Sequence, residues 1–136
     1  MPPNKFWKLT KEWFERAEED FNVALLIFEE KNYPASVCFH LHQAIEKYLK
    51  GLLVYFGKDI EEEFKIHNLV KLYGYVRESY QNFPENIKKN CLLLNRYYIE
   101  TRYPEETPQY PWKEVEQAIE AAKQIKKQVL EITKTE

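Results

Sequence analysis

The sequence predicts an all-α protein, a five-helix up-and-down antiparallel bundle with a four-helix core and one extra helix. Apolar residues recur at every third or fourth position in the long segments, which is typical of amphipathic helices and not of strands. Glycine occurs only 3 times in 136 residues, and short connections make successive helices neighbours. The length is typical of one domain, so we expect a single helical domain over residues 1–136.

The first two helices are predicted by their end signals. We expect the first to begin at Thr10, a residue type that caps helix N-termini, and to end at the loop KNYP, residues 31–34, because the residue before a proline disfavours the helical conformation. The second begins near Pro34 and closes at Gly57, a suitable C-terminal cap. Its wide apolar band makes it the most hydrophobic helix, and we expect it to be central.

Three more helices follow. The third is expected at about His67–Tyr80, with Asn68 or His67 in its first turn, the fourth at about 85–102, and the fifth from after Pro111 to about Thr133. The acidic stretch DIEEEF before the third helix is expected to be a solvated connector. The stretch RYPEETPQYP before the fifth contains three prolines, so we expect an extended loop there.

Composition and charge exclude several classes of protein. The net charge of −2 gives the molecule no strong overall field for nucleic acid, although a local basic patch can still attract it. The apolar runs fall far short of the ~20 residues of a membrane span, and the N-terminus has no signal-peptide core. We therefore expect a cytoplasmic protein with no membrane partner, in which Cys38 and Cys91 are reduced core thiols.

A row of polar side chains runs along the second helix. His42, Glu46 and Lys50 are spaced by four residues, so they share one face of a helix that otherwise looks central. The simpler interpretation is a solvated stripe with a favourable Glu46–Lys50 pair. The alternatives are a functional cleft or a buried network, because polar groups on a central helix need either solvent or partners.

The fourth helix offers partners for this row. Asn95, Tyr98 and Arg102 recur on one face, and an arginine beside tyrosines suits phosphate contact together with base stacking. Alternatively, the tyrosines lie at the edge of the core and the arginine pairs with a helix carboxylate. We expect no metal site and no cofactor, because His40 and His42 point to different faces and no cluster has the spacing of metal ligands.

Three stretches together resemble the HEPN domain family (higher eukaryotes and prokaryotes nucleotide-binding). They are HLHQAIEKYLKGLLVYFG at 40–57, IHNLVKLY at 66–73 and YYIETRYPEE at 97–106. The resemblance implies a five-helix bundle, usually dimeric, that often works beside a separate minimal nucleotidyltransferase in a toxin–antitoxin pair. It also implies nucleotide or RNA binding at the matching positions, to which the polar rows add two more. The full candidate set is His42, Glu46, Lys47, Lys50, His67, Asn95, Tyr98 and Arg102.

The chain departs from the family in one motif. Many members are metal-independent ribonucleases with an Arg-x(4–6)-His motif, whereas no histidine follows Arg96 or Arg102 here, and the last one in the chain is His67. The usual proton-transfer partner is therefore missing from the motif, which leaves both enzymatic activity and the catalytic residues undetermined.

The residues are compatible with three functions. The first is a nucleotide- or single-stranded-RNA-binding homodimer that partners a minimal nucleotidyltransferase. The second is a divergent metal-independent endoribonuclease toxin. The third is a purely structural or interaction dimer of helices, which the aromatic content of 15% also favours.

Overall fold

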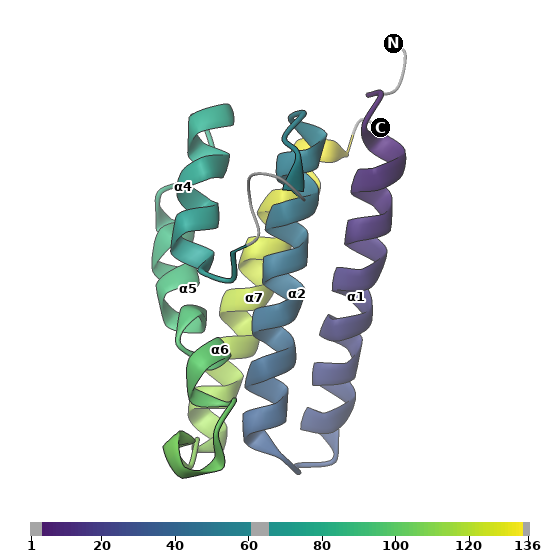
Figure 1. The fold of residues 1–136 in the computed structure, drawn as a ribbon. Coiled ribbons are helices and arrows are strands. Elements are labelled where there is room, and N and C mark those ends of the chain that lie inside the picture. The colour runs from purple at the N-terminus through teal and green to yellow at the C-terminus, as the bar shows by residue number, and fades with distance from the viewer. Residues whose placement is uncertain (1–3, 61–65, 135–136) are drawn as a thin grey trace.

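The computed structural model describes residues 4–60 and 66–134, and these contain helices and no strand. The expected all-α bundle is confirmed (Figure 1). Its elements are α1 (Trp7–Glu29), α2 (Pro34–Tyr55), α4 (Leu69–Ser79), α5 (Asn86–Asn95), the short α6 (Tyr97–Glu100), a 3₁₀ turn η1 (Pro104–Glu106) and α7 (Trp112–Thr133).

Helix α2 forms the centre of the bundle. It contacts α1, α4, α5, α6 and α7, and Figure 1 shows it between α1 on one side and the α4–α6 layer on the other. Most of its apolar side chains, among them Leu41, Ile45 and Leu49, are buried. Polar side chains on the same helix must therefore find partners inside the bundle or at its surface.

The contact between α1 and α2 is unusually close at one glycine. A Cβ atom at Gly51 would meet side-chain atoms of Trp13 and Phe14 at 2.8 Å, and the buried Thr10 hydroxyl donates a hydrogen bond to the Gly51 carbonyl at 3.1 Å. The prediction that Thr10 caps α1 is wrong. The helix begins about one turn earlier, at Trp7, whose ring packs against the core.

The predicted ends of the second, third and fifth helices agree with the structure to within about two residues. Pro34 lies in the first turn of α2, and Gly57 follows the end of that helix with a φ of 88°. Asn68 caps α4, since its side-chain oxygen accepts hydrogen bonds from two amides of the first turn at 3.0 and 3.1 Å. Helix α7 spans the residues predicted for the fifth helix.

The fourth predicted helix, 85–102, is not continuous. It breaks at Arg96 into α5 and α6. The break lets the ring of Tyr97 be fully buried, while its hydroxyl donates to Glu114 of α7 at 2.9 Å and Arg96 pairs with the same carboxylate. The proline-rich loop after α6 is extended only in part, because η1 forms a short turn within it.

Helix α4 runs in the same direction as α2, which departs from strict alternation. The start of α4 lies beside the middle of α2, where His67 contacts Glu46, and its end lies beside the end of α2, where Phe56 and Tyr80 stack with centroids 5.9 Å apart. The start of α4 therefore lies part way along α2 and not at its end (Figure 1). Most of the predicted connector DIEEEF lies outside the described residues.

Two further expectations concern the thiols and the membrane. Cys38 and Cys91 are free and buried, as predicted, and burial raises the pKa of both thiols to about 12. Within the described residues, no helix combines the length and the hydropathy needed to span a membrane. The cytoplasmic location stays a prediction.

Candidate functional site

A buried carboxylate links two basic side chains beside α2. Glu46 accepts a hydrogen bond from Nδ1 of His67 at 2.9 Å and, through its other oxygen, one from Nζ of Lys50 at 3.0 Å. The Glu46 and Lys50 side chains are 6% and 7% exposed, whereas that of His67 is 48% exposed. Because Nδ1 carries the proton donated to the carboxylate, Nε2 is the nitrogen of His67 that can exchange a proton with a ligand.

His42 lies fully buried beneath this pair. Its Nε2 donates to the backbone carbonyl of His67 at 3.0 Å, and its Nδ1 accepts from the side-chain amide of Gln43 at 3.3 Å. A neutral ring satisfies both contacts. Burial lowers the pKa of His42 to about 4, although the nearby Glu46 carboxylate opposes the effect. We infer that His42 holds the backbone of His67 in place. His42 itself does not transfer protons at neutral pH.

Tyr98 of α6 joins this pair to an arginine. Its ring stacks on that of His67, with centroids 4.2 Å apart and planes at 15°, and lies 5.5 Å from the ring of His42. The guanidinium of the exposed Arg102 lies 5.0 Å from the same ring centroid. Since these neighbours engage the Tyr98 ring, we infer that it positions His67 and Arg102 and is not an open platform for a base.

Asn95 closes the cluster from the end of α5. Its side-chain oxygen accepts a hydrogen bond from the backbone amide of Leu69 at 2.8 Å, which fastens the first turn of α4 to α5. The two rows predicted from the sequence are therefore brought together, with the segment before α4 between them. We call this group the His67 cluster; its members are His42, Glu46, Lys50, His67, Asn95, Tyr98 and Arg102.

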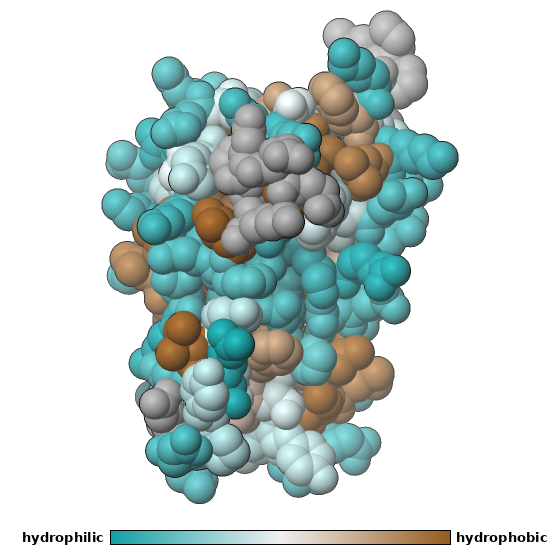
Figure 2. Space-filling view, viewed as in Figure 1, coloured by the Kyte–Doolittle hydropathy of each residue, from teal (hydrophilic) through white to brown (hydrophobic). Residues whose placement is uncertain are grey.

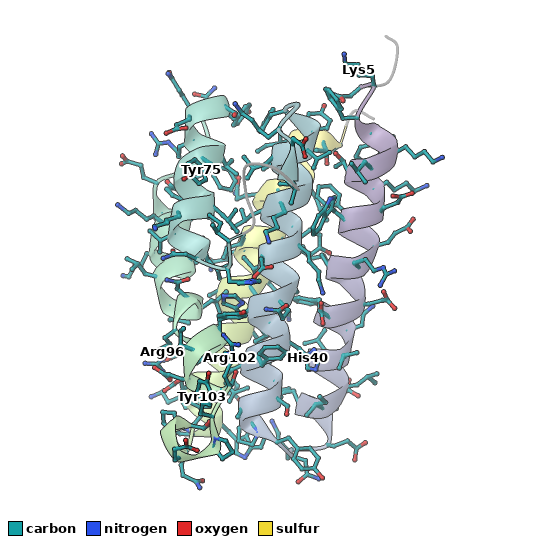
Figure 3. All side chains as sticks on the ribbon, in the orientation of Figure 1. Lys5, His40, Tyr75, Arg96, Arg102 and Tyr103 are labelled. Carbon is teal, nitrogen blue, oxygen red and sulfur yellow. The ribbon has the colours of Figure 1, made fainter. Side chains whose placement is uncertain are left out.

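Lys47 is the predicted site residue that the structure does not bring into the cluster. It pairs with Asp20 of α1, whose other oxygen lies 3.0 Å from Nδ1 of His40. Figure 3 shows His40 and Arg102 on the same face of the molecule but on opposite sides of α2. His40 and Lys47 are seven residues apart and so share a helix face, but their carboxylate partner, Asp20, comes from another helix. The spacing alone therefore did not reveal this second group of Asp20, His40 and Lys47.

The His67 cluster is locally basic although the whole protein is slightly acidic. Glu46 is the carboxylate among its members and contacts Lys50 and His67, and the second permanent cation, Arg102, lies against the Tyr98 ring. Figure 2 shows that hydrophilic side chains cover most of this face over the middle of α2. Every buried side-chain nitrogen or oxygen among the described residues has a hydrogen-bond partner, so the network is complete as it stands.

The chemistry available here is phosphate contact and proton transfer. Among the side chains that the structure describes, no group of three or more His, Cys, Asp or Glu residues is arranged to hold a metal ion. A guanidinium at the surface suits phosphate oxygens, and an imidazole held by a buried carboxylate suits general acid–base work. Ligand binding by the predicted residues stays a prediction.

The chain matches the family model described as HEPN domain over residues 10–132, nearly its whole length. It belongs to the HEPN family. Among curated proteins it is similar to the one named "Putative toxin MJ1304" from Methanocaldococcus jannaschii, with 29% identity over 101 residues, which cover 72% of this chain and 65% of that protein. The HEPN chain thus spans less than two thirds of this relative's length. No solved structure matches it.

Proposed function

We propose that this HEPN protein binds the phosphate of a nucleotide or of single-stranded RNA at the His67 cluster. The observation that carries the proposal is the placement of Arg102 and His67 against one ring, that of Tyr98. The guanidinium offers two parallel N–H donors to phosphate oxygens. A protonated His67 adds another donor, and its half-exposed ring offers a face to a base.

The binding test compares two arginines. ATP, GTP and a short single-stranded RNA are titrated against the wild type, Arg102→Ala and Arg77→Ala. Arg77 is a matched control because it lies on α4 and contacts Tyr73 and Glu85, away from the cluster. Losing one charge-assisted contact to phosphate costs ~1.5–3 kcal/mol, so Arg102→Ala should bind about 10-fold to 100-fold more weakly. Equal affinity of all three proteins would reject the proposal.

We further propose that the protein is the toxin-like member of a two-gene pair, with a minimal nucleotidyltransferase as its partner. Membership of the HEPN family and the similarity to the relative named "Putative toxin MJ1304" support this. The test is co-purification with the product of the neighbouring gene, followed by analysis of any nucleotide or RNA that accompanies the complex. A neighbour of another kind, or one that does not bind, would count against the pairing.

A second candidate function is RNA cleavage, and the Glu46–His67 hydrogen bond favours it. In this reaction Nε2 of His67 takes the proton of a ribose 2′-hydroxyl, the 2′ oxygen attacks phosphorus, and the 5′ oxygen leaves with a proton from water. Glu46 stabilises the imidazolium that forms, as a carboxylate does beside a catalytic histidine, and Arg102 holds the phosphate oxygens. The products are a 2′,3′-cyclic phosphate and a 5′-hydroxyl. Because no step in this mechanism uses a metal ion, the products should also form in the presence of EDTA.

A homodimer is also expected, from the family resemblance. A dimer would allow phosphate binding or RNA cleavage to use side chains from two copies of the chain. In the purely structural alternative, forming the dimer is itself the function. Light scattering at micromolar concentrations distinguishes the cases: a dimer that binds no nucleotide or RNA supports the structural alternative, and a monomer removes it.

A further inference from the structure

Arg102 borders a pocket as well as the His67 cluster. The pocket has a volume of about 310 Å³ and lies between the first turns of α2 and the residues that follow α6; its lining is Ala35, Ser36, Phe39, Thr101 and Arg102. In Figure 3, Arg102 lies beside the lower part of α2, between the two elements. A phosphate held by Arg102 would therefore lie near both the Tyr98 ring and this pocket.

The lining suits a flat, mostly apolar group with polar edges. Ala35 and the half-buried Phe39 supply apolar surface, and Ser36 and Thr101 supply hydroxyls. The Thr101 hydroxyl already donates to the Tyr97 carbonyl at 2.6 Å, so it is left as an acceptor. Phe39 supplies the aromatic ring against which a base can stack. Its volume is near the lower end of the ~300–1,000 Å³ range of ligand pockets, which indicates a small group.

The pocket is not suited to a second phosphate. The backbone amides of Ser36 and Val37 both donate to the carbonyl of Tyr33, at 3.0 and 3.1 Å, so they are not free to bind an anion. The cation of the pocket is Arg102, which is shared with the cluster. A nucleobase next to the bound phosphate fits these surroundings better than another anion.

A second hollow continues from the first around the start of α2. It has a volume of about 350 Å³, shares Ala35 and Ser36 with the pocket, and is bordered by Tyr33 and by prolines of the loop before α7. Tyr33 is 68% exposed and has a left-handed φ of 51°. For a non-glycine residue this backbone conformation is uncommon and costs energy, and such strain is concentrated at functional positions.

We propose that the pocket lined by Ser36 and Phe39 receives the neighbouring base of single-stranded RNA, next to the nucleotide whose phosphate is bound by Arg102 and whose own base lies against His67, and that the strand continues over Ser36 towards Tyr33. This proposal rests on the proposed function and makes it more specific: the ligand is an oligonucleotide of about three or more nucleotides, not a mononucleotide. Each stacked base contributes ~1–3 kcal/mol, so affinity should rise about tenfold or more between one nucleotide and three.

The test measures affinity against length. Fluorescently labelled RNAs of one to six nucleotides are titrated by anisotropy against the wild type, Ser36→Trp, Phe39→Ala and the control Gln117→Trp, which also introduces a tryptophan but at an exposed position of α7. We expect Ser36→Trp to abolish the gain from length without weakening the mononucleotide. Phe39→Ala should reduce the gain about tenfold, and Gln117→Trp should behave as wild type. Circular dichroism confirms that each variant is folded.

The outcomes separate the two proposals. If the wild type binds mononucleotides and trinucleotides equally, the subsite is refuted while the phosphate site stands. If no length binds, the proposed function fails first and the subsite with it. If Ser36→Trp weakens every length alike, the gain from length survives a filled pocket, which overturns the subsite. If the pocket variants alter only the oligomeric state, the pocket holds a protein side chain and the proposal is wrong.

Discussion

A carboxylate, a histidine and a lysine form a hydrogen-bonded group on each of two sides of helix α2. The two groups differ in how deeply their side chains are buried. In the first, Glu46 and Lys50 are almost entirely covered and only His67 reaches the surface. In the second, Asp20 is 15% exposed and its partners His40 and Lys47 about 30%. The same three residue types therefore form an internal network on one side and a surface ion pair on the other.

The surroundings of the two imidazoles differ as well. His67 stacks face to face on Tyr98, next to Arg102, whereas His40 meets Phe39 edge-on, with centroids 5.5 Å apart and planes at 74°. A fixed imidazole next to a surface guanidinium can act on a phosphate. His40 lies instead in a partly solvated ion pair with Asp20 and is not shown beside a guanidinium. The Asp20–His40 group is thus a control for the His67 cluster within the same helix.

The largest expected difference is in catalysis. If the protein cleaves RNA, His67→Ala should lower the initial rate by ~100-fold or more, because proton transfer by a positioned side chain contributes ~10²–10⁴-fold. His40→Ala should leave the rate within about twofold of wild type. The measurement is the appearance of 2′,3′-cyclic phosphate ends in EDTA. Equal losses in both variants would show that the difference between the two groups has no catalytic meaning.

Stability should separate the groups next. Glu46→Gln leaves the Lys50 ammonium buried without its counter-charge, and breaking a buried pair in this way costs ~3–5 kcal/mol. Asp20→Asn removes a pair that water already reaches, so its cost should be ~0–1 kcal/mol. Urea unfolding followed by circular dichroism at pH 7 measures both free energies. A cost below about 1 kcal/mol for Glu46→Gln would mean that Lys50 turns out to solvent when its partner is lost.

Acid should weaken the buried side of α2 through His42. The pKa of this ring is about 4 in the folded protein against an ordinary value of 6.5. Between these values the unfolded chain binds a proton that the folded chain excludes, so the stabilising contribution is complete above pH 6.5 and is lost as the pH falls towards 4. The free energy of unfolding should drop by about 2 kcal/mol from pH 7 to pH 5 on this account.

A variant isolates the contribution of this ring. His42→Gln keeps a side-chain donor for the carbonyl of His67 but cannot titrate, so its stability should change by about 2 kcal/mol less than that of wild type between pH 7 and pH 5. Urea unfolding at the two pH values gives the comparison. Parallel pH dependence of the two proteins would assign the acid sensitivity to other groups.

Helical periodicity was sufficient to predict much of the His67 cluster. Spacing by four places His42, Glu46 and Lys50 on one face whatever the fold. The spacing of Tyr98 and Arg102 also suggested a shared face, but α6 ends at Glu100, so Arg102 reaches the Tyr98 ring from the turn after the helix. The bundle itself follows from the same apolar pattern. These features depend on local geometry, which the order of residues determines directly.

Features that depend on contacts between helices were not predictable in this way. The spacing of Lys47 does not reveal that Asp20 of α1 covers it. The approach of His67 to Glu46 depends on the return of the chain along α2, and short-connection rules predict the opposite direction for the next helix. At the break in the fourth predicted helix, Arg96 likewise pairs with Glu114 of α7, which is far away in the sequence.

The smallest expected difference concerns the ring that supports the cluster. Tyr98→Leu removes the stack on His67, and aromatic pairs are worth ~0.5–1.5 kcal/mol beyond their buried area, so unfolding should become easier by about 1 kcal/mol. Tyr103→Leu, at a 48% exposed ring, should stay within about 0.5 kcal/mol of wild type. The ring protons of His67 should also lose the ring-current shift that Tyr98 causes in the NMR spectrum. If that shift is already absent in wild type, the imidazole is not held against the tyrosine in solution, and it then has no more fixed position than His40 does on the other side of α2.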